Sequence, residues 1–461
     1  VYARLAEAVR GLIVDGRLEL GARLPSERDL AISLGVSRNT VTRAYDVLRE
    51  RGFLDSRQGS GSVTRLPIPT PTGRDAGVLR PQEAASDDVI DLTCAALRAP
   101  AGIDEAYQAA LEALPRHLAG VGYTTTGLAE LREALADRYT ARGLPTTPDQ
   151  ILITSGAVTA MILVAGMLAS PGQRVLIEDP TFPNTSAALR ASGLRLHGAP
   201  VDSTGWDVTH WASVIKRGRP GIACLIPDFQ NPTGALMSDA DRAALSAALG
   251  ASGTTAIVDE TVCEMVLDAP HVPAPFAAHC LSAFSVGSSS KLFWGGLRTG
   301  WIRTPGPVPE GLIARRVTGD GGAALLEQLV LTHLLRTDRG ALDAERRDSL
   351  LDARDATASA LTQLVPLAVF ERPSGGLSLW VELPGLSAGE VAFRARDHGL
   401  LLAAGPRFSV GHGCTSRLRL PFVHGASVMV DAVRRLAHAV EDVESGLNGT
   451  IRTPTGSPLV A

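Results

Sequence analysis

Lysine is nearly absent from this chain of 461 residues. Only two of its 44 basic residues are lysines, Lys216 and Lys291, and all the others are arginines. Arginine therefore serves as the general surface cation, so a lysine inside a motif is unusually informative. Lys216 lies in the stretch VIKRGRP, which contains no recognisable motif, and we interpret it as a solvated residue.

Cysteines and long apolar runs are also scarce. The five cysteines form no Cys-x-x-Cys pair. This excludes a disulfide framework and a zinc site of paired cysteines, so we expect reduced, mostly buried thiols and no metal. No apolar run reaches the roughly 18 residues that cross a membrane, and the N-terminus lacks the pattern of a signal peptide. We therefore expect a cytoplasmic protein without membrane contact.

Composition and charge set the domain organisation. Hydrophobic residues make up 45% of the chain, which excludes global disorder. The net charge of −4 excludes a chain that coats nucleic acid through its overall charge. The length suggests about three domains. We expect a head at residues 1–66, a proline-rich linker at 67–88, an effector domain at 89–445 and a tail at 446–461. Within the effector domain we expect a large domain at about 120–310 and a small domain at about 311–445 with part of 89–119.

The middle of the chain has an α/β pattern. Short runs rich in Val and Ile alternate with helical stretches, and this predicts a mixed, mostly parallel sheet covered by helices on both faces. Ligands of such sheets bind at the carboxyl ends of the strands, so we sought chemistry there. The runs lie at residues 151–156, 175–180, 223–228, 255–260 and 283–288.

The first 66 residues have the pattern of a helix-turn-helix. Ser26 and Ser37 are N-cap candidates for two short helices that a turn at Gly35 joins. In such a motif the second helix presents its first turn to base edges. The stretch FLDSRQGSGSVT predicts a hairpin with a glycine-rich tip, which is a wing whose Arg57 would reach a phosphate or the minor groove. The alternative is a three-helix module that packs against protein.

The resemblance of this head is specific. The stretch LPSERDLAISLGVSRNTVTRAYDVLRERGFL, followed by QGSG, resembles the winged helix of GntR-type bacterial regulators over nearly all of residues 1–65. The resemblance implies double-stranded DNA as a partner. It places Arg28, Ser37, Arg38, Asn39, Thr40 and Gly59 at DNA-contact positions, while Arg43 is a phosphate contact inferred from its place on the helix.

The clearest chemical signal is SVGSSSKLFWGGLRTGW at residues 285–301. Lys291 follows a predicted strand and three serines. A phosphorylated aldehyde would require an amine for an imine, and hydroxyls and a guanidinium for its phosphate. Lys291 meets the first requirement, and Ser288, Ser290 and Arg298 meet the second. For Lys291 alone, the alternative is a solvated surface residue.

Four further motifs follow predicted strands. TSGAVTA opens a helix whose Gly156 and Ala157 amides can bind phosphate. DPTFPN offers the ring of Phe182 for stacking, and DFQNPTG offers Asn231 for hydrogen bonding. IVDE ends with Asp259, a carboxylate suited to a protonated pyridine nitrogen. Each motif alone has a simpler explanation, such as a turn or a helix cap, but their order is informative.

This set of motifs resembles the pyridoxal-phosphate enzymes of the aspartate aminotransferase fold, fold type I, over about residues 89–440. The resemblance implies pyridoxal 5'-phosphate bound as an aldimine to Lys291, with Asp259 on the pyridine nitrogen. Asn231 would contact the ring oxygen and Phe182 the ring face. The phosphate would be held by Ser155, Gly156, Ala157, Ser288 and Arg298.

Two more residues and one departure follow from this resemblance. GYTTTGLAELREALADRY resembles the segment that lends a tyrosine to the partner subunit's phosphate, so Tyr123 is expected to span a dimer. In SRLRLPF, Arg419 matches the arginine that grips a substrate carboxylate, with a surface salt bridge as the alternative. The family usually has a tyrosine two or three residues after Asp259. Thr261 and Val262 stand there instead, which puts efficient turnover in question.

The two halves together resemble the MocR subfamily of GntR-type transcription regulators. This implies a regulator that senses pyridoxal phosphate, alone or with an amine or amino acid, and forms head-to-tail homodimers in which each head packs on the partner's large domain. Our hypothesis is that an amine replaces Lys291 on the cofactor and engages Arg419, so that the small domain closes and re-aims the heads. The alternatives are an active aminotransferase with a DNA-binding head and a module that has lost the cofactor.

Overall fold

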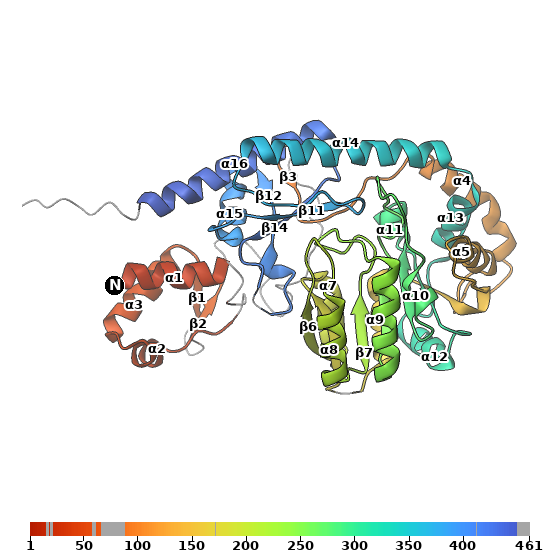
Figure 1. The fold of residues 1–461 in the computed structure, drawn as a ribbon, viewed down its shortest axis with the longest axis horizontal. Helices are drawn as coiled ribbons and strands as arrows, with labels where there is room; N and C mark the ends of the chain where they lie inside the picture. The colour runs from red at the N-terminus through yellow and green to blue at the C-terminus, as the bar shows by residue number, and fades with distance from the viewer. Residues whose placement is uncertain are drawn as a thin grey trace, which may run out of the picture.

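The computed structural model describes residues 1–14, 18, 22–57, 61–65, 88–170, 172–411 and 413–449. The head, at the red end of the chain in Figure 1, lies beside α15 (Ala388–Arg394) of the small domain. The large domain lies farther along, and the long helix α14 (Gly340–Leu364) extends across the top. Gly59 and all but the last residue of the expected linker lie outside the described residues.

The head has the predicted helix-turn-helix and hairpin. Helix α1 (Tyr2–Val14) precedes α2 (Glu27–Leu34) and α3 (Arg38–Glu50). Strands β1 (Leu54–Arg57) and β2 (Gly61–Thr64) pair antiparallel.

Both predicted caps of the head are present. Ser26 accepts a hydrogen bond from the backbone N–H of Asp29, and Ser37 accepts one from that of Thr40. Gly35 ends α2 with φ +63°, a left-handed conformation that glycine adopts without strain. The side chains of Val41, Tyr45 and Leu48, all on one face of α3, belong to the buried core of the head.

The large domain is built on a seven-stranded sheet in the order β4-β10-β9-β8-β7-β5-β6. All five predicted runs are strands of this sheet, which confirms its mixed, mostly parallel character, while β6 and β10 were not predicted. Strand β10 runs antiparallel to β4 and β9, because the short connection after β9 leaves no room for a crossover helix. The strands are β4 (Ile151–Thr154), β5 (Arg174–Asp179), β6 (Arg195–Pro200), β7 (Ile222–Leu225), β8 (Thr255–Asp259), β9 (Phe284–Ser288) and β10 (Gly300–Arg303).

Helices cover both faces of this sheet. One face packs against α6 (Ala157–Leu168), α7 (Pro183–Ala191) and α12 (Glu310–Gly319). The other face packs against a larger set of helices, α4 (Ile103–Ala113), α5 (Ala129–Ala141), α8 (Val208–Gly218), α9 (Asp239–Ser252) and α13 (Leu325–Arg336). The sheet is therefore buried on both faces, as continuous apolar strands require.

The small domain contains a three-stranded sheet in the order β11-β14-β13. Helices α14, α15 and α16 (Ala426–Gly449) pack on one of its faces. Strands β3 (Ile90–Asp91) and β12 (Leu400–Leu401) form a short parallel pair nearby. The three strands of the sheet are β11 (Ser378–Glu382), β13 (Ala403–Ala404) and β14 (Arg417–Pro421).

Two expected boundaries differ from the structure. Helices α12 and α13, which we expected in the small domain, pack into the cores of the large domain because their apolar faces contact α6, α4 and α5. The expected start of the tail at residue 446 falls inside α16, which continues to Gly449. The buried side chains of Leu436, Val440 and Val443 hold this helix on the domain as far as Val443.

The head docks on the small domain of its own chain through α1 and α15. Arg10 and Glu390 form an ion pair of 2.5 Å, and their side chains are only 15% and 13% exposed. The rings of Phe53 and Phe393 are 5.9 Å apart, and the Arg10 guanidinium lies 5.9 Å from the Phe53 ring. The structure describes one chain, so the expected contact with a partner's large domain stays a prediction.

Within the described residues, no helix is both long enough and apolar enough to cross a membrane. The same residues contain no group of three or more side chains that is suited to hold a metal ion.

Candidate functional site

The predicted site residues gather at the carboxyl ends of the parallel strands, where the large domain meets the small domain. Asp259 ends β8 and Ser288 ends β9, while Ser155 directly follows β4. Arg419 reaches the same place from β14 of the small domain, where its Nη1 lies 3.3 Å from Oδ1 of Asn231. The candidate site residues from Ser155 to Arg419, which span 265 positions of the sequence, thus lie together at one edge of the sheet.

Lys291 lies on the short helix α11 (Ser289–Leu292) and points toward the N-terminal segment of the effector domain. Its Nζ donates a hydrogen bond to the carbonyl oxygen of Ala95. Burial lowers the pKa of Lys291, and the nearby Arg419 lowers it further, while Cys94 and Asp259 oppose the shift. A lowered pKa increases the fraction of neutral amine, which is the nucleophilic form.

Asp259 is a buried carboxylate, only 6% exposed, with no ion-pair partner in the part of the chain that the structure describes. It accepts a hydrogen bond of 2.9 Å from the backbone N–H of Thr261. Burial raises the pKa of Asp259, and the hydrogen bonds from Thr261 partly oppose that shift. Thr261, which stands where the sequence lacks the expected tyrosine, therefore orients Asp259.

The phosphate cup, which we define as Ser155, Gly156, Ala157, Ser288 and Arg298, combines amides, hydroxyls and a guanidinium. Gly156 caps α6 with φ +106°, and a Cβ there would lie 3.2 Å from Nη2 of Arg298. A Cβ on Gly300 would lie 2.6 Å from the backbone of Gly156, so both positions require glycine. This set of donors at the start of a 12-residue helix suits a phosphate dianion.

The cup is closed by side chains from β9 and the segment after it. The hydroxyls of Ser288 and Ser290 are 2.6 Å apart, and Ser288 accepts a hydrogen bond from the backbone N–H of Ser290. Arg298 donates to the carbonyl oxygen of Ser155 at 3.3 Å. The structure therefore brings together the residues that the sequence predicted for the phosphate.

Arg419 is only 1% exposed, which shows that a surface salt bridge, the alternative for this residue, is wrong. Its Nη2 donates to the carbonyl oxygen of Thr93 at 2.6 Å, and its guanidinium lies 4.9 Å from the ring of Phe408. Burial lowers the pKa of Arg419 to about 10. Its Nε has no partner within the described residues, and no acidic side chain there pairs with it. A buried guanidinium without a counter-ion is suited to bind a ligand carboxylate.

Phe182 packs against a small aromatic cluster at the junction of the two domains. The rings of Trp380 and Phe408 are 5.6 Å apart and nearly perpendicular. Trp380 and Arg419 are cross-strand partners in the small-domain sheet, so they lie on the same face. The cluster therefore joins Phe182 of the large domain to Arg419.

Glu178 is a residue that sequence reasoning missed. It is fully buried in β5 and accepts hydrogen bonds from Trp206 Nε1 at 3.0 Å, the N–H of Ile226 at 2.9 Å and Gln230 Nε2 at 3.0 Å. Burial raises its pKa to about 7. Glu178 thereby fixes the loop that carries Asn231. A glutamate at a strand end is too common to have revealed this role.

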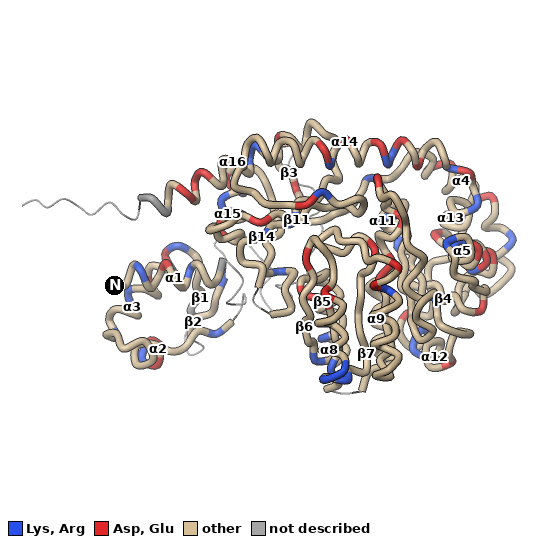
Figure 2. The backbone as a smooth tube through the Cα atoms, in the orientation of Figure 1, with Lys and Arg blue, Asp and Glu red and all other residues tan. Residues whose placement is uncertain are grey.

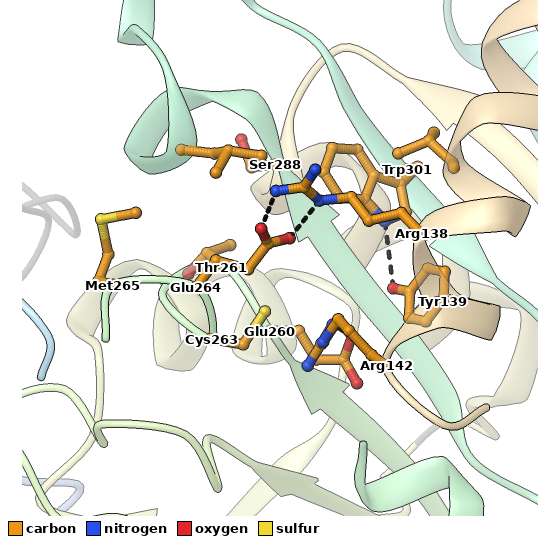
Figure 3. A pocket seen from close by; sticks show the side chains of 12 residues that line it. Arg138, Tyr139, Arg142, Glu260, Thr261, Cys263, Glu264, Met265, Ser288 and Trp301 are labelled. Atoms are coloured by element: carbon orange, nitrogen blue, oxygen red, sulfur yellow. Dashed lines mark hydrogen bonds and ion pairs between the residues drawn. The ribbon is translucent and has the colours of Figure 1, made fainter. Parts of the chain in front are cut away.

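A small cavity lies beside the turn that follows Asp259 (Figure 3). Arg138 pairs with Glu264 along its wall, as the dashed lines in Figure 3 indicate. Arg142 lies 3.4 Å from the buried Glu260. Because these charges are already paired, we interpret the cavity wall as a support for the turn after Asp259.

Tyr123 does not contribute to the site of its own chain. Its side chain is 79% exposed and lies near Gly321. Its expected role in a partner's site stays a prediction.

The predicted DNA contacts lie on the exposed surface of the head. Arg28, Arg38 and Asn39 are exposed, and Arg38 and Asn39 occupy the first turn of α3. The hydroxyls of Ser37 and Thr40 are 2.8 Å apart and belong to the helix cap. The exposed guanidinium of Arg43 lies 5.4 Å from the ring of Tyr2. The side chain of Arg57, like Gly59, lies outside the described residues.

Residues of both charge signs are scattered over the described parts of the head and of the effector domain in Figure 2, in keeping with the net charge of −4. The expected binding to DNA would therefore depend on the local placement of the arginines in the head rather than on the overall field.

Comparisons with known proteins agree with both halves. Residues 87–436 match the family described as aminotransferase class I and II, and residues 1–63 match the bacterial regulatory proteins of the gntR family. The chain is 30% identical to the uncharacterized HTH-type transcriptional regulator YdcR of Escherichia coli (strain K12), over 89% of this chain and 92% of that protein. It is 27% identical to the probable rhizopine catabolism regulatory protein MocR of Rhizobium meliloti, over 86% of this chain and 84% of that protein.

Among solved structures, the chain is similar to LysN, the alpha-aminoadipate aminotransferase of Thermus thermophilus. The TM-score is 0.71 and the identity 28%, and the match covers 81% of this chain and 98% of that chain. That structure was determined in complex with N-(5'-phosphopyridoxyl)-L-leucine.

Proposed function

Because the chain belongs to the class I and II aminotransferase family over residues 87–436 and carries a gntR-family head at residues 1–63, we propose that this regulator of the MocR type controls transcription by sensing pyridoxal phosphate. The observation that carries the proposal is the convergence of Lys291, Asp259 and Arg419 at one site, on the chain that also holds a winged helix. A cytoplasmic location remains a prediction.

The residues at the site fit the cofactor. The phosphate cup offers amides and hydroxyls together with the guanidinium of Arg298. Asp259 is a buried carboxylate with no ion pair among the described residues, which suits a protonated ring nitrogen. When bound, pyridoxal phosphate supplies an aldehyde that reacts with amines and a ring that accepts electrons.

The protein's own residues then have distinct tasks. Lys291 presents an amine whose pKa is lowered by burial, which increases the fraction of the neutral form that attacks an aldehyde. Asn231 and Arg419 lie within hydrogen-bonding distance of each other and would orient a carboxylate-bearing effector. Phe182 and Phe408 wall the site with apolar surface, which excludes water and strengthens the charge interactions inside.

The small-domain sheet and α15 connect the ligand site to the DNA-binding head. Arg419 pairs across the sheet with Ala403 of β13, and α15 packs on β13 and β14. The same helix contacts the head through Glu390 and Phe393. A ligand on Arg419 therefore acts on the head through one sheet and one helix. To change DNA occupancy, it must bind one arrangement better, and an about 100-fold preference equals about 2.7 kcal/mol.

A homodimer is part of this proposal. Large apolar side chains are exposed in the segment before α5 and on α6. They include Leu118, Val121 and Tyr123 at 68%, 87% and 79% before α5, and Ile162 at 45% on α6. Exposed apolar residues of this size mark association surfaces. In a dimer built on this surface, Tyr123 would complete the phosphate cup of the partner.

The direct test combines absorbance with DNA footprinting. Purified protein mixed with pyridoxal phosphate should gain an absorbance band that borohydride removes. Lys291→Ala should prevent the band, whereas Lys216→Ala, which removes the other lysine, should not. Footprints upstream of the protein's own gene should change with pyridoxal phosphate in the wild type and in Lys216→Ala only. A colourless protein, or footprints that ignore the cofactor, would refute the proposal.

The second candidate is an active aminotransferase with a DNA-binding head. The presence of Lys291, Asp259 and Arg419 together favours it, because this set supports transamination in the family. The test is multiple turnover with a panel of amino acids and 2-oxoglutarate. A turnover near the ~10 s⁻¹ typical of enzymes would support this candidate over a pure sensor.

A further inference from the structure

An acidic side chain lies at the edge of the phosphate cup. Asp320 follows the last turn of α12, and its Oδ2 accepts a hydrogen bond of 3.2 Å from the hydroxyl of Ser155. Its Oδ1 accepts one of 3.3 Å from the backbone N–H of Gly322. The side chain is 33% exposed, so this carboxylate is in contact with solvent and faces the cup.

Among the described residues, Asp320 forms an ion pair with Arg316, one helical turn earlier on α12. Arg316 is fully buried and pairs with Asp320 through Nη1. Its Nε and Nη2 have no partner in the part of the chain that the structure describes. The buried guanidinium of Arg316 therefore holds the Asp320 carboxylate in place, and this carboxylate faces Ser155.

A phosphate in the cup would compete with Asp320. The hydroxyl of Ser155 has a single proton to donate, and Asp320 already accepts it. A phosphate dianion at the amides of Gly156 and Ala157 would also lie close to the Asp320 carboxylate, and like charges at short range repel. Arg316 neutralises part of that charge, because it pairs with the same oxygen that faces Ser155.

We propose that Asp320 weakens the binding of the cofactor's phosphate and that Arg316 limits this effect. The inference rests on the proposed function and refines it. An enzyme benefits from a cofactor that stays bound, whereas a sensor must release its ligand when the concentration falls. Asp320 sets the concentration of pyridoxal phosphate at which the protein responds.

The test is Asp320→Asn, which keeps the shape of the side chain and removes its charge. The full-length protein is titrated with pyridoxal phosphate and, in parallel, with pyridoxal, which lacks the phosphate, and the absorbance of the lysine-bound aldehyde is followed. We expect the affinity for pyridoxal phosphate to rise about ten-fold, which is about 1.4 kcal/mol. The affinity for pyridoxal should stay the same. The matched control is Glu310→Gln, which removes one exposed negative charge at the other end of α12 and should leave both affinities unchanged.

A second measurement uses inorganic phosphate as the probe. Phosphate should raise the thermal unfolding temperature of Asp320→Asn more than that of the wild type. A third variant, Arg316→Gln, should bind pyridoxal phosphate more weakly than the wild type, and adding Asp320→Asn to it should recover the affinity. If Arg316→Gln fails to fold, the two measurements on Asp320→Asn decide.

The outcomes separate this inference from the proposed function. If Asp320→Asn binds pyridoxal phosphate no tighter than the wild type, or gains equally for pyridoxal, the role of Asp320 is refuted while the sensor function stands. If neither protein takes up pyridoxal phosphate on Lys291, the sensor function fails, and this inference fails with it.

Discussion

At the scale of single residues, buried carboxylates give the site its rigidity. Glu178 accepts three hydrogen bonds from two different segments, and Asp259 is oriented by Thr261. Neither carboxylate has an ion-pair partner among the described residues. Hydrogen-bond donors thus keep these buried groups in place and partly oppose the rise in pKa that burial causes.

Glu178→Gln tests this role. An amide cannot accept every bond that the carboxyl group accepts, because its NH₂ group would face the NH₂ group of Gln230, whereas the oxygen of a protonated carboxyl can still accept that bond. Near pH 5 we expect the variant to lose about 1–3 kcal/mol in the free energy of unfolding, measured with urea.

The effect of Glu178→Gln should depend on pH. The folded-state pKa of Glu178 is raised to about 7 from the ordinary 4.5. Its contribution to stability is therefore complete below pH 4.5 and is lost as the pH rises through 7. The stability gap between wild type and variant should shrink over this window by up to about 3 kcal/mol. The exposed Glu310→Gln serves as the control, and a gap that widens with pH would contradict the assignment.

At the scale of elements, helix caps and strand ends do much of the positioning. Ser37 caps α3 and thereby fixes the direction of the first turn, which carries Arg38 and Asn39. The start of α6 at Gly156 presents its amides in the same way to the phosphate cup. In both halves, the residues that are expected to meet an anion lie at the N-terminus of a helix.

Ser37→Ala should show that the cap of α3 affects the head and its DNA binding but not the cofactor site. Loss of the bond that the Thr40 N–H donates to Ser37 Oγ should cost about 1 kcal/mol of head stability and weaken DNA binding, while uptake of pyridoxal phosphate stays unchanged. Circular dichroism and a DNA titration measure the two effects. The matched control is Ser33→Ala in α2, because its hydroxyl bonds only to a carbonyl of its own helix. Equal losses in both variants would argue against a special role for the cap.

Local patterns in the sequence were sufficient to predict most of these elements. The N-caps, the turn at Gly35 and five strands of the large sheet depend on neighbouring residues and on apolar runs. The antiparallel direction of β10 was not predicted, because this direction results from the short connection after β9 rather than from the composition of the strand. The membership of α12 and α13 in the large domain depends on contacts with distant helices.

The same limit applies to individual site residues. Lys291 and Asp259 were predicted because motifs mark them, and the comparisons support that family. Asp320 and Ser155 are separated by 165 positions, and Arg10 and Glu390 by 380. Such pairs carry no local signal, and only the folded chain brings them together.

At the scale of the whole molecule, the head and the effector domain are joined by a small interface with charge at its centre. Arg10 of α1 pairs with Glu390 of α15, and the rings of Phe53 and Phe393 lie beside this pair. The interface is partly buried, and Arg10 also pairs with Glu7 and Glu390 with Arg394. Reversing either charge therefore places like charges against each other at this surface.

Charge reversal tests this interface. Arg10→Glu and Glu390→Arg should each uncouple the DNA footprint from pyridoxal phosphate, without a change in the absorbance of bound cofactor. The double variant should restore the coupling because the pair re-forms with opposite polarity. As a control, Arg51→Glu lies on the exposed side of the same head and carries a longer pair of 3.4 Å with Glu7. Single variants that respond like the wild type would place the coupling elsewhere.

The coupling that we propose through the contact of α1 with α15 also acts in the reverse direction, from DNA to the ligand site. If ligand at Arg419 shifts the head, operator DNA held by the head must shift the affinity for that ligand by the same factor. The operator is then itself an effector of the cofactor site. Protein bound at its promoter would have a different pyridoxal phosphate affinity from protein free in solution, so each promoter sequence would tune its own response.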